Sequence, residues 1–105
     1  PVEADAMNHE PFGPLALIRP FGTEDEALEQ ANRLPYGLAA FAFTENGRRI
    51  NRILDSIESG MVGVNSFLIP ALDTPFGGIK ESGLGRESRP AGLDGYLVTK
   101  AVHIY

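Results

Sequence analysis

Apolar residues occur along this chain in short continuous runs separated by amphipathic stretches. The runs at 15–21 (LALIRPF), 38–44 (LAAFAFT) and 61–64 (MVGV) have the length of strands and lack the regular polar alternation of a half-exposed strand. Solid apolar runs of this kind are typical of parallel strands that are buried on both faces. The pattern therefore predicts three buried strands.

The stretch between the first two runs predicts a helix. Thr23 and Glu26 have the spacing of a capping box, which opens a helix. The residues that follow keep one face apolar until the breaker sequence at 35–37 (PYG): Ala27, Ala31 and Leu34.

A second helix is predicted between the second and third runs. Either Thr44 or Asn46 can cap it, and Gly60 stands where a C-cap glycine is expected. Its apolar residues recur at the spacing of a single helix face: Ile50, Ile53, Leu54 and Ile57.

This order of elements predicts an α/β fold, a β-α-β-α-β open parallel sheet with right-handed crossovers. Residues 65–85 then form a long loop that leaves the carboxyl end of the third strand, where open α/β sheets bind ligands. Residues 97–105 alternate in polarity, which favours a partly exposed strand of the kind found at sheet edges.

Charge and composition narrow the possible functions. The net charge of −5 argues against nucleic acid or an anionic membrane as a partner, and no apolar run approaches the ~20 residues of a membrane span. The chain has no cysteine, hence no disulfide and no thiolate of its own. His9 and His103 stand at opposite ends without a ligand cluster, so no metal site is expected. We interpret the arginines of the second helix as a solvated face: Arg48, Arg49 and Arg52.

The stretch at 75–87 (PFGGIKESGLGRE) holds four glycines among thirteen residues, which suits neither a helix nor a strand. It is no dinucleotide fingerprint, because Ser88 stands where a third glycine would follow Gly83 and Gly85. It also lacks P-loop spacing, and Ser82 has Lys80 instead of glycine two residues before it, so it forms no nucleophile elbow. The residues alone therefore indicate an α/β domain with a functional glycine loop.

Three motifs, taken in their order and spacing, resemble a known family: EPFGP (10–14), GMVGVN (60–65) and the glycine stretch at 75–87. Together they resemble the C-terminal part of the NAD(P)-dependent aldehyde dehydrogenase superfamily, over essentially the whole chain. The resemblance implies that residues 1–92 belong to the catalytic domain and that residues 93–105 form an oligomerisation strand. It also implies a homo-oligomer, and we expect a cytoplasmic location.

The resemblance implies a cofactor site, for NAD or NADP, at EPFGP. Glu10 corresponds to a glutamate that holds the nicotinamide ribose hydroxyls, and a carboxylate can accept from both. Phe12 corresponds to an aromatic residue that packs beside the nicotinamide ring. The sequence does not distinguish NAD from NADP.

The resemblance also assigns a substrate-entry loop, with Asn65 at its root, where its side-chain amide can tie down the backbone of the loop. Its residues that line the aldehyde tunnel are Leu68, Pro70 and Phe76. The glycines would let the backbone pack tightly and turn sharply beneath the active site: Gly77, Gly78, Gly83 and Gly85. Three charged residues would brace that turn rather than perform chemistry: Lys80, Arg86 and Glu87.

The substrate class has two interpretations. The residues of the motifs are similar to those of the succinate-semialdehyde branch of the family. In that branch a serine from this loop tends to bind the substrate carboxylate. This chain has Pro70 there, within the apolar segment 67–72 (FLIPAL), which favours an apolar aldehyde unless arginines elsewhere bind a carboxylate.

Two classes of function are compatible with the chain. In the first, it is a fragment of an aldehyde dehydrogenase, by proteolysis or as a truncated gene product. The cysteine that forms a thioester, the glutamate base and the cofactor-binding domain then lie outside it, and the chain alone is inactive. In the second, it is a non-catalytic interaction module of the same fold. In both, its partners include the remainder of the enzyme or further copies of the chain.

Overall fold

The computed structural model describes residues 3–69 and 73–105. The fold mixes helices and strands, as the sequence predicts. In chain order the elements are η1 (Asp5–Met7), α1 (Glu24–Asn32), β1 (Tyr36–Gly37), β2 (Ala39–Ala42), α2 (Gly47–Ser56), β3 (Met61–Val64), β4 (Ile79–Lys80), α3 (Arg89–Leu93) and η2 (Asp94–Tyr96).

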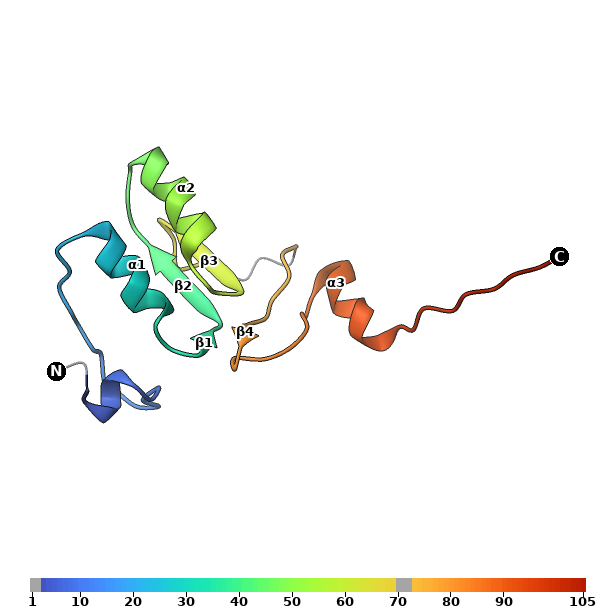
Figure 1. Cartoon of the computed structure of the whole chain (residues 1–105), viewed down its shortest axis with the longest axis horizontal. Helices are drawn as coiled ribbons and strands as arrows, with labels where there is room; N and C mark the ends of the chain where they lie inside the picture. Colours follow the sequence, from blue (N-terminus) through green and yellow to red (C-terminus); the bar gives the residue numbers. More distant parts are fainter. Residues whose placement is uncertain (1–2, 70–72) are drawn as a thin grey trace.

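The centre of the fold is the β2-α2-β3 unit, in which helix α2 connects two neighbouring strands (Figure 1). β2 and β3 pair in parallel, with Ala39 opposite Met61 and Ala42 opposite Val64, so the predicted parallel crossover is confirmed here. Helices α1 and α2 line, together with the inner face of β2, a common hollow of about 560 Å³. Asn46 is the residue that caps α2, because its side-chain oxygen accepts from the N–H of Arg49 at 3.1 Å.

Helix α1 begins as its capping sequence predicts. The Thr23 hydroxyl accepts from the N–H of Glu26 at 3.2 Å, and the Glu26 carboxylate accepts from the N–H of Gly22 at 2.9 Å. The helix ends at Asn32, before Leu34, and residues 36–37 then form the short strand β1, which the sequence reading treats as a helix breaker.

The predicted first strand, residues 15–21, is not formed. A strand exists only through hydrogen bonds to a neighbour, and the one backbone hydrogen bond of this segment within the described residues runs from the N–H of Leu15 to the oxygen of Gly13. Ile18 and Phe21 remain 94% and 64% exposed. The predicted three-stranded parallel sheet is therefore a two-stranded one in this chain.

The predicted unbroken loop over 65–85 is also corrected. It contains β4, which pairs antiparallel with β1, Tyr36 opposite Lys80 and Gly37 opposite Ile79. The prediction for Gly60 is wrong as well, because α2 ends at Ser56 with Ile57 as its C-cap. Gly60 instead lies against the backbone of the glycine loop.

The C-terminal segment 97–105 forms no strand and extends away from the body of the molecule (Figure 1). Val98 and Ile104 are 94% and 91% exposed, because no neighbouring strand is there to pair with. The expected domain boundary after residue 92 falls inside α3. The tail contributes to a radius of gyration of 17.7 Å, against about 13 Å for a compact chain of this length.

The hydrophobic core is small. Among the described residues, Met61 at 7% exposure is the one buried apolar side chain, and the other buried residues are glycines. Large apolar residues stay exposed over all parts of the chain, among them Phe12, Leu68 and Leu84. Exposed apolar surface on this scale is typical of surfaces that contact another protein, a membrane or a ligand.

Candidate functional site

The glycine loop is closed at its base by backbone pairing. The N–H of Phe76 donates to the oxygen of Glu87 at 2.9 Å, and the N–H of Glu87 donates to the oxygen of Phe76 at 2.7 Å. The guanidinium of Arg86 reaches into the loop, where one nitrogen donates to the oxygens of Gly78 (2.8 Å) and Gly85 (2.7 Å). Residues 76–87 therefore form a closed loop with a cationic donor inside it.

The glycines of this loop are required for two different reasons, lack of space for a side chain and a positive φ angle. A Cβ on Gly77 would lie 2.8 Å from the oxygen of Gly85, and one on Gly78 would lie 2.7 Å from the Cβ of Ser82. These two positions lack space for a side chain. Gly83 and Gly85 have open space around them but φ angles of +134° and +77°, which residues with a Cβ rarely adopt.

Lys80 anchors the loop to the rest of the fold. It has a φ of +56°, and its ammonium forms an ion pair with Glu58. The same nitrogen donates to the backbone oxygens of Asn32 (3.3 Å) and Leu34 (3.4 Å), at the end of α1. The hydroxyl of Ser82 accepts from the N–H of Gly37 at 2.9 Å, which adds a second anchor in β1.

The root of the expected substrate loop lies at the carboxyl end of β3. Asn65 is there, with its side-chain amide bonded to the backbone of Thr44 at the end of β2. Leu68 is 89% exposed, and Pro70 lies outside the described residues. Phe67, which the sequence reading did not single out, packs its ring against Phe43, with 4.8 Å between ring centroids.

The expected cofactor residues lie on the N-terminal segment. Arg33 holds that segment against the end of α1 by donating to the side-chain oxygen of Asn8 (2.7 Å) and to the oxygen of Met7 (2.6 Å). Glu10 is exposed, lines a groove of about 360 Å³, and has no hydrogen-bond or ion-pair partner within the described part of the chain. Phe12 is 95% exposed.

The chain alone does not bring all expected site residues together. Glu10 lines the groove between the N-terminal segment and β1, whereas Phe76 lines an adjoining hollow of about 700 Å³ beside the glycine loop and Tyr96. Leu68 lines neither. The site residues therefore lie on separate parts of an incompletely covered surface.

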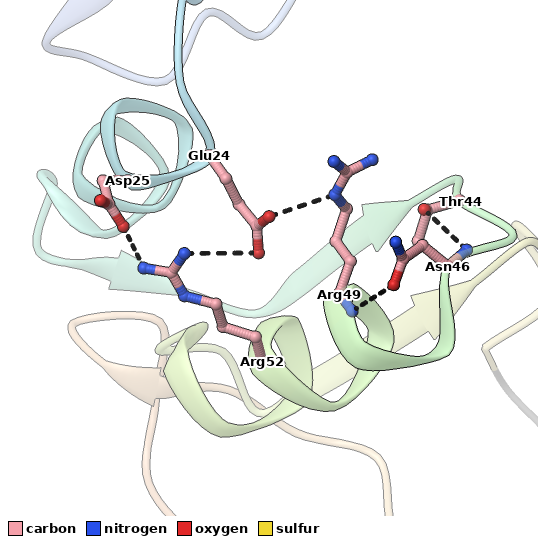
Figure 2. A network of polar contacts seen from close by, with 6 residues as sticks. All are labelled: Glu24, Asp25, Thr44, Asn46, Arg49 and Arg52. Atoms are coloured by element: carbon pink, nitrogen blue, oxygen red, sulfur yellow. Dashed lines mark hydrogen bonds and ion pairs between the residues drawn. The ribbon is translucent and has the colours of Figure 1, made fainter.

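An ion-pair network that sequence reasoning missed joins α1 to α2 (Figure 2). Arg49 pairs with Glu24 at 3.1 Å, and Arg52 pairs with Asp25 and, at 3.7 Å, with Glu24. The hydrogen bond to Asp25 and the negative charges of Asp25 and Glu24 raise the pKa of Arg52. Two of the three arginines interpreted as a solvated face are thus half exposed but paired. The three acidic residues in the first turn of α1 were the available signal.

Two kinds of feature are absent from residues 3–69 and 73–105. No helix in that part of the chain is long and apolar enough to cross a membrane. No group of three potential metal ligands comes together there either.

Comparison with known proteins establishes the class of the chain. Residues 1–102 match the profile of the aldehyde dehydrogenase family, so the chain belongs to that family. It is 47% identical to 2-hydroxymuconic semialdehyde dehydrogenase of Pseudomonas putida over 95% of this chain and 21% of the relative. It is 46% identical to human mitochondrial succinate-semialdehyde dehydrogenase over 90% of this chain and 18% of the relative. The chain thus spans about a fifth of the length of these relatives.

Solved structures agree with this assignment. Succinate-semialdehyde dehydrogenase from Burkholderia pseudomallei superimposes with a TM-score of 0.88 at 42% identity, over 93% of this chain and 20% of that one. Betaine aldehyde dehydrogenase from Staphylococcus aureus, solved in complex with NAD+, gives a TM-score of 0.89 at 36% identity, over 95% and 20%. The fold described above is therefore a segment of the aldehyde dehydrogenase fold.

Proposed function

We propose that this chain is the C-terminal segment of an NAD(P)-dependent aldehyde dehydrogenase, which oxidises an aldehyde to a carboxylic acid. The observation that carries the proposal is the family match over residues 1–102, together with three motifs in register on a matching fold. The chain contains no cysteine. The nucleophile that forms the thioester is therefore contributed by polypeptide outside this chain. In this proposal the general base lies outside it as well.

The residues of the N-terminal segment fit a nicotinamide cofactor. The Glu10 carboxylate is exposed and unpaired within the described residues, so both oxygens are free to accept from two ribose hydroxyls. The exposed ring of Phe12 offers an apolar face on which a flat ring can pack. When bound, NAD or NADP would supply the hydride acceptor for oxidation of the aldehyde. Glu10 and Phe12 would orient it, and the exposure of both supports contact with something other than this chain.

The loop after β3 would supply the aldehyde contacts. Leu68 is an exposed apolar side chain, Phe76 is 37% exposed beside the glycine loop, and Pro70 has no donor for a carboxylate. These properties support an apolar aldehyde as substrate. In this proposal Asn65 roots the loop, while Lys80, Arg86 and Glu87 brace the glycine loop beneath it through the contacts described above.

A role in association is proposed as well. The exposed apolar surface supports contact with the remainder of the enzyme. The tail after residue 92 would become a strand in a homo-oligomer, because it contains the strand formers Val98, Thr99, Val102, Ile104 and Tyr105. The same observation favours the alternative function, a non-catalytic interaction module. We propose the cytoplasm as its location.

The experiment replaces Glu10 with glutamine in the full-length enzyme that carries this segment. The substitution removes the charge that accepts from the ribose, and such a hydrogen bond contributes about 1.5–3 kcal/mol. Binding of NAD or NADP, measured by fluorescence titration, is expected to weaken by about 10- to 150-fold. Thermal stability is expected to stay unchanged, because Glu10 has no partner in the described part of the fold.

Glu29→Gln is the matched control, since Glu29 is an exposed acid on α1 without a recorded partner in the described chain. It should leave cofactor affinity unchanged. Equal affinity in the parent and in Glu10→Gln would refute the assignment of Glu10, and absence of any aldehyde-dependent cofactor reduction by the parent would refute the enzyme function.

A further inference from the structure

Asn65 has an unusual backbone conformation at the point where β3 ends. Its φ is +56°, in the left-handed region that non-glycine residues seldom occupy, although asparagine tolerates it better than most. Its N–H still donates to the oxygen of Ala42 at 2.8 Å, as the last bond of the parallel ladder. The chain therefore leaves the sheet immediately after this hydrogen bond.

The side-chain amide of Asn65 then makes the hydrogen bonds that the backbone of a further β3 residue would make to β2. Its oxygen accepts from the N–H of Thr44 at 2.8 Å, and its nitrogen donates to the oxygen of the same residue at 2.9 Å. Both polar groups of the Thr44 backbone are satisfied by one amide. The side chain thus clamps the end of β2, whereas the sequence reading expected it to tie down the backbone of the loop.

The left-handed turn at Asn65 directs residues 66–68 back over the sheet. The oxygen of Ser66 lies 2.7 Å from where a Cβ on Gly63 would be. The ring of Phe67 packs on both Phe43 and Phe41, at centroid distances of 4.8 and 5.2 Å. Leu68 follows directly, so its position depends on the turn that Asn65 makes.

The clamped residue is also connected to α2. The hydroxyl of Thr44 accepts from the N–H of Asn46 at 3.2 Å, and Asn46 caps the helix through Arg49 (Figure 2). Arg49 in turn pairs with Glu24 of α1 at 3.1 Å. The root of the loop is thereby fixed to both helices and not only to the sheet.

We propose that Asn65 is a positioning residue for substrate binding, which holds Phe67 and Leu68 in place by clamping Thr44 while adopting the left-handed turn. This inference rests on the proposed function, because it takes residues 66–68 to lie beside the aldehyde. Loss of the clamp loosens a surface that contacts the substrate in its ground state and its transition state alike. Such a loss raises KM and leaves kcat largely unchanged.

The test uses the full-length enzyme that carries this segment, with hexanal and succinate semialdehyde as substrates. Asn65→Gly keeps the left-handed conformation accessible and removes the amide, so it isolates the clamp. We expect KM for the aldehyde that the enzyme prefers to rise about tenfold with kcat within about twofold. Asn65→Asp keeps an acceptor for the Thr44 N–H but no donor, and should give an intermediate KM.

Asn32→Ala is the matched control. Asn32 makes the same kind of clamp at the opposite end of the sheet, donating to the oxygen of Ser56 at 2.7 Å and accepting from the N–H of Glu58 at 2.9 Å. Its loss should lower thermal stability as Asn65→Gly does but leave KM unchanged. Hydrogen exchange at the Thr44 amide should accelerate about tenfold in Asn65→Gly and not in Asn32→Ala.

An active parent whose KM is unchanged by Asn65→Gly would overturn the positioning role, as would equal KM increases in Asn65→Gly and Asn32→Ala. Unchanged exchange at Thr44 would overturn the clamp itself. A parent that oxidises neither aldehyde would instead overturn the proposed function on which the inference rests.

Discussion

Gly60 lies where the start of β3 meets the glycine loop, and its replacement by alanine is a direct test of that contact. A Cβ there would lie 2.0 Å from the oxygen of Gly77 and 2.9 Å from the Cα of Gly78. Ordinary carbon contacts are about 3.5 Å or more, so backbone has to move by about 1.5 Å. Both neighbours are backbone atoms, which cannot rotate away as a flexible side chain could.

The cost of this substitution follows from the constraints on both sides of the contact. Gly60 is fixed to Gly37 by a backbone hydrogen bond of 2.9 Å, and the loop on the other side is closed by the Phe76–Glu87 pair. Overpacking costs about 1–3 kcal/mol, and we expect the upper end, about 3 kcal/mol, because neither side can yield without losing hydrogen bonds. Since the φ of Gly60 is not positive, the loss arises from space and not from backbone conformation.

The assay is urea denaturation of the full-length enzyme that carries this segment, followed by circular dichroism and by activity. Gly47→Ala is the control, because Gly47 begins α2 and a Cβ there meets nothing within 4 Å. It should stabilise the protein by about 0.4–1 kcal/mol. The reasoning is refuted if Gly60→Ala is no less stable than Gly47→Ala.

Three further predictions concern the loop and the tail. Arg86→Met should destabilise the enzyme by about 1.5–3 kcal/mol, because two loop carbonyls lose a charged donor, and urea denaturation measures it. Gly83→Ala should cost about 1–3 kcal/mol through its φ of +134° alone, so a neutral effect in the same assay would contradict that conformation. A chain that ends at Gly95 should sediment as a smaller species than the intact chain at equal concentration, since the intact tail offers unpaired backbone groups and exposed Val98 and Ile104. Monomers in both samples would exclude the tail as an association element.

Local signals in the sequence predicted the elements that depend on local contacts. The caps at Thr23 and Asn46 determine where the two helices begin, and both side chains make the expected hydrogen bonds. The runs around β2 and β3 predicted a parallel pair, because the intervening helix requires a crossover. These features need no partner outside residues 23–64.

The predictions that failed depend on distant partners. Residues 15–21 and 97–105 have the composition of strands, but a strand forms only where another strand pairs with it. The two-residue strand β4 was missed because its antiparallel pairing with β1 joins residues about 43 positions apart, without a periodic pattern in either.

For the candidate site, too, the sequence predicted local features but not the contacts between distant residues. The motifs located the glycine loop and Asn65, but no pattern indicates that Gly60 meets Gly77 or that the Asn65 amide clamps Thr44. Such contacts join residues through the fold, and asparagine and glycine are common in turns for many other reasons.

The central claim is that this chain supplies cofactor and substrate contacts to an aldehyde dehydrogenase whose nucleophile lies outside it. The most direct measurement is aldehyde-dependent reduction of NAD or NADP, made in parallel on the full-length enzyme and on the purified 105-residue chain. The full-length enzyme should reduce one of the cofactors only when an aldehyde is present, and the chain alone should reduce neither, because it has no cysteine. Turnover by the chain alone, or none by the full-length enzyme, would contradict the claim.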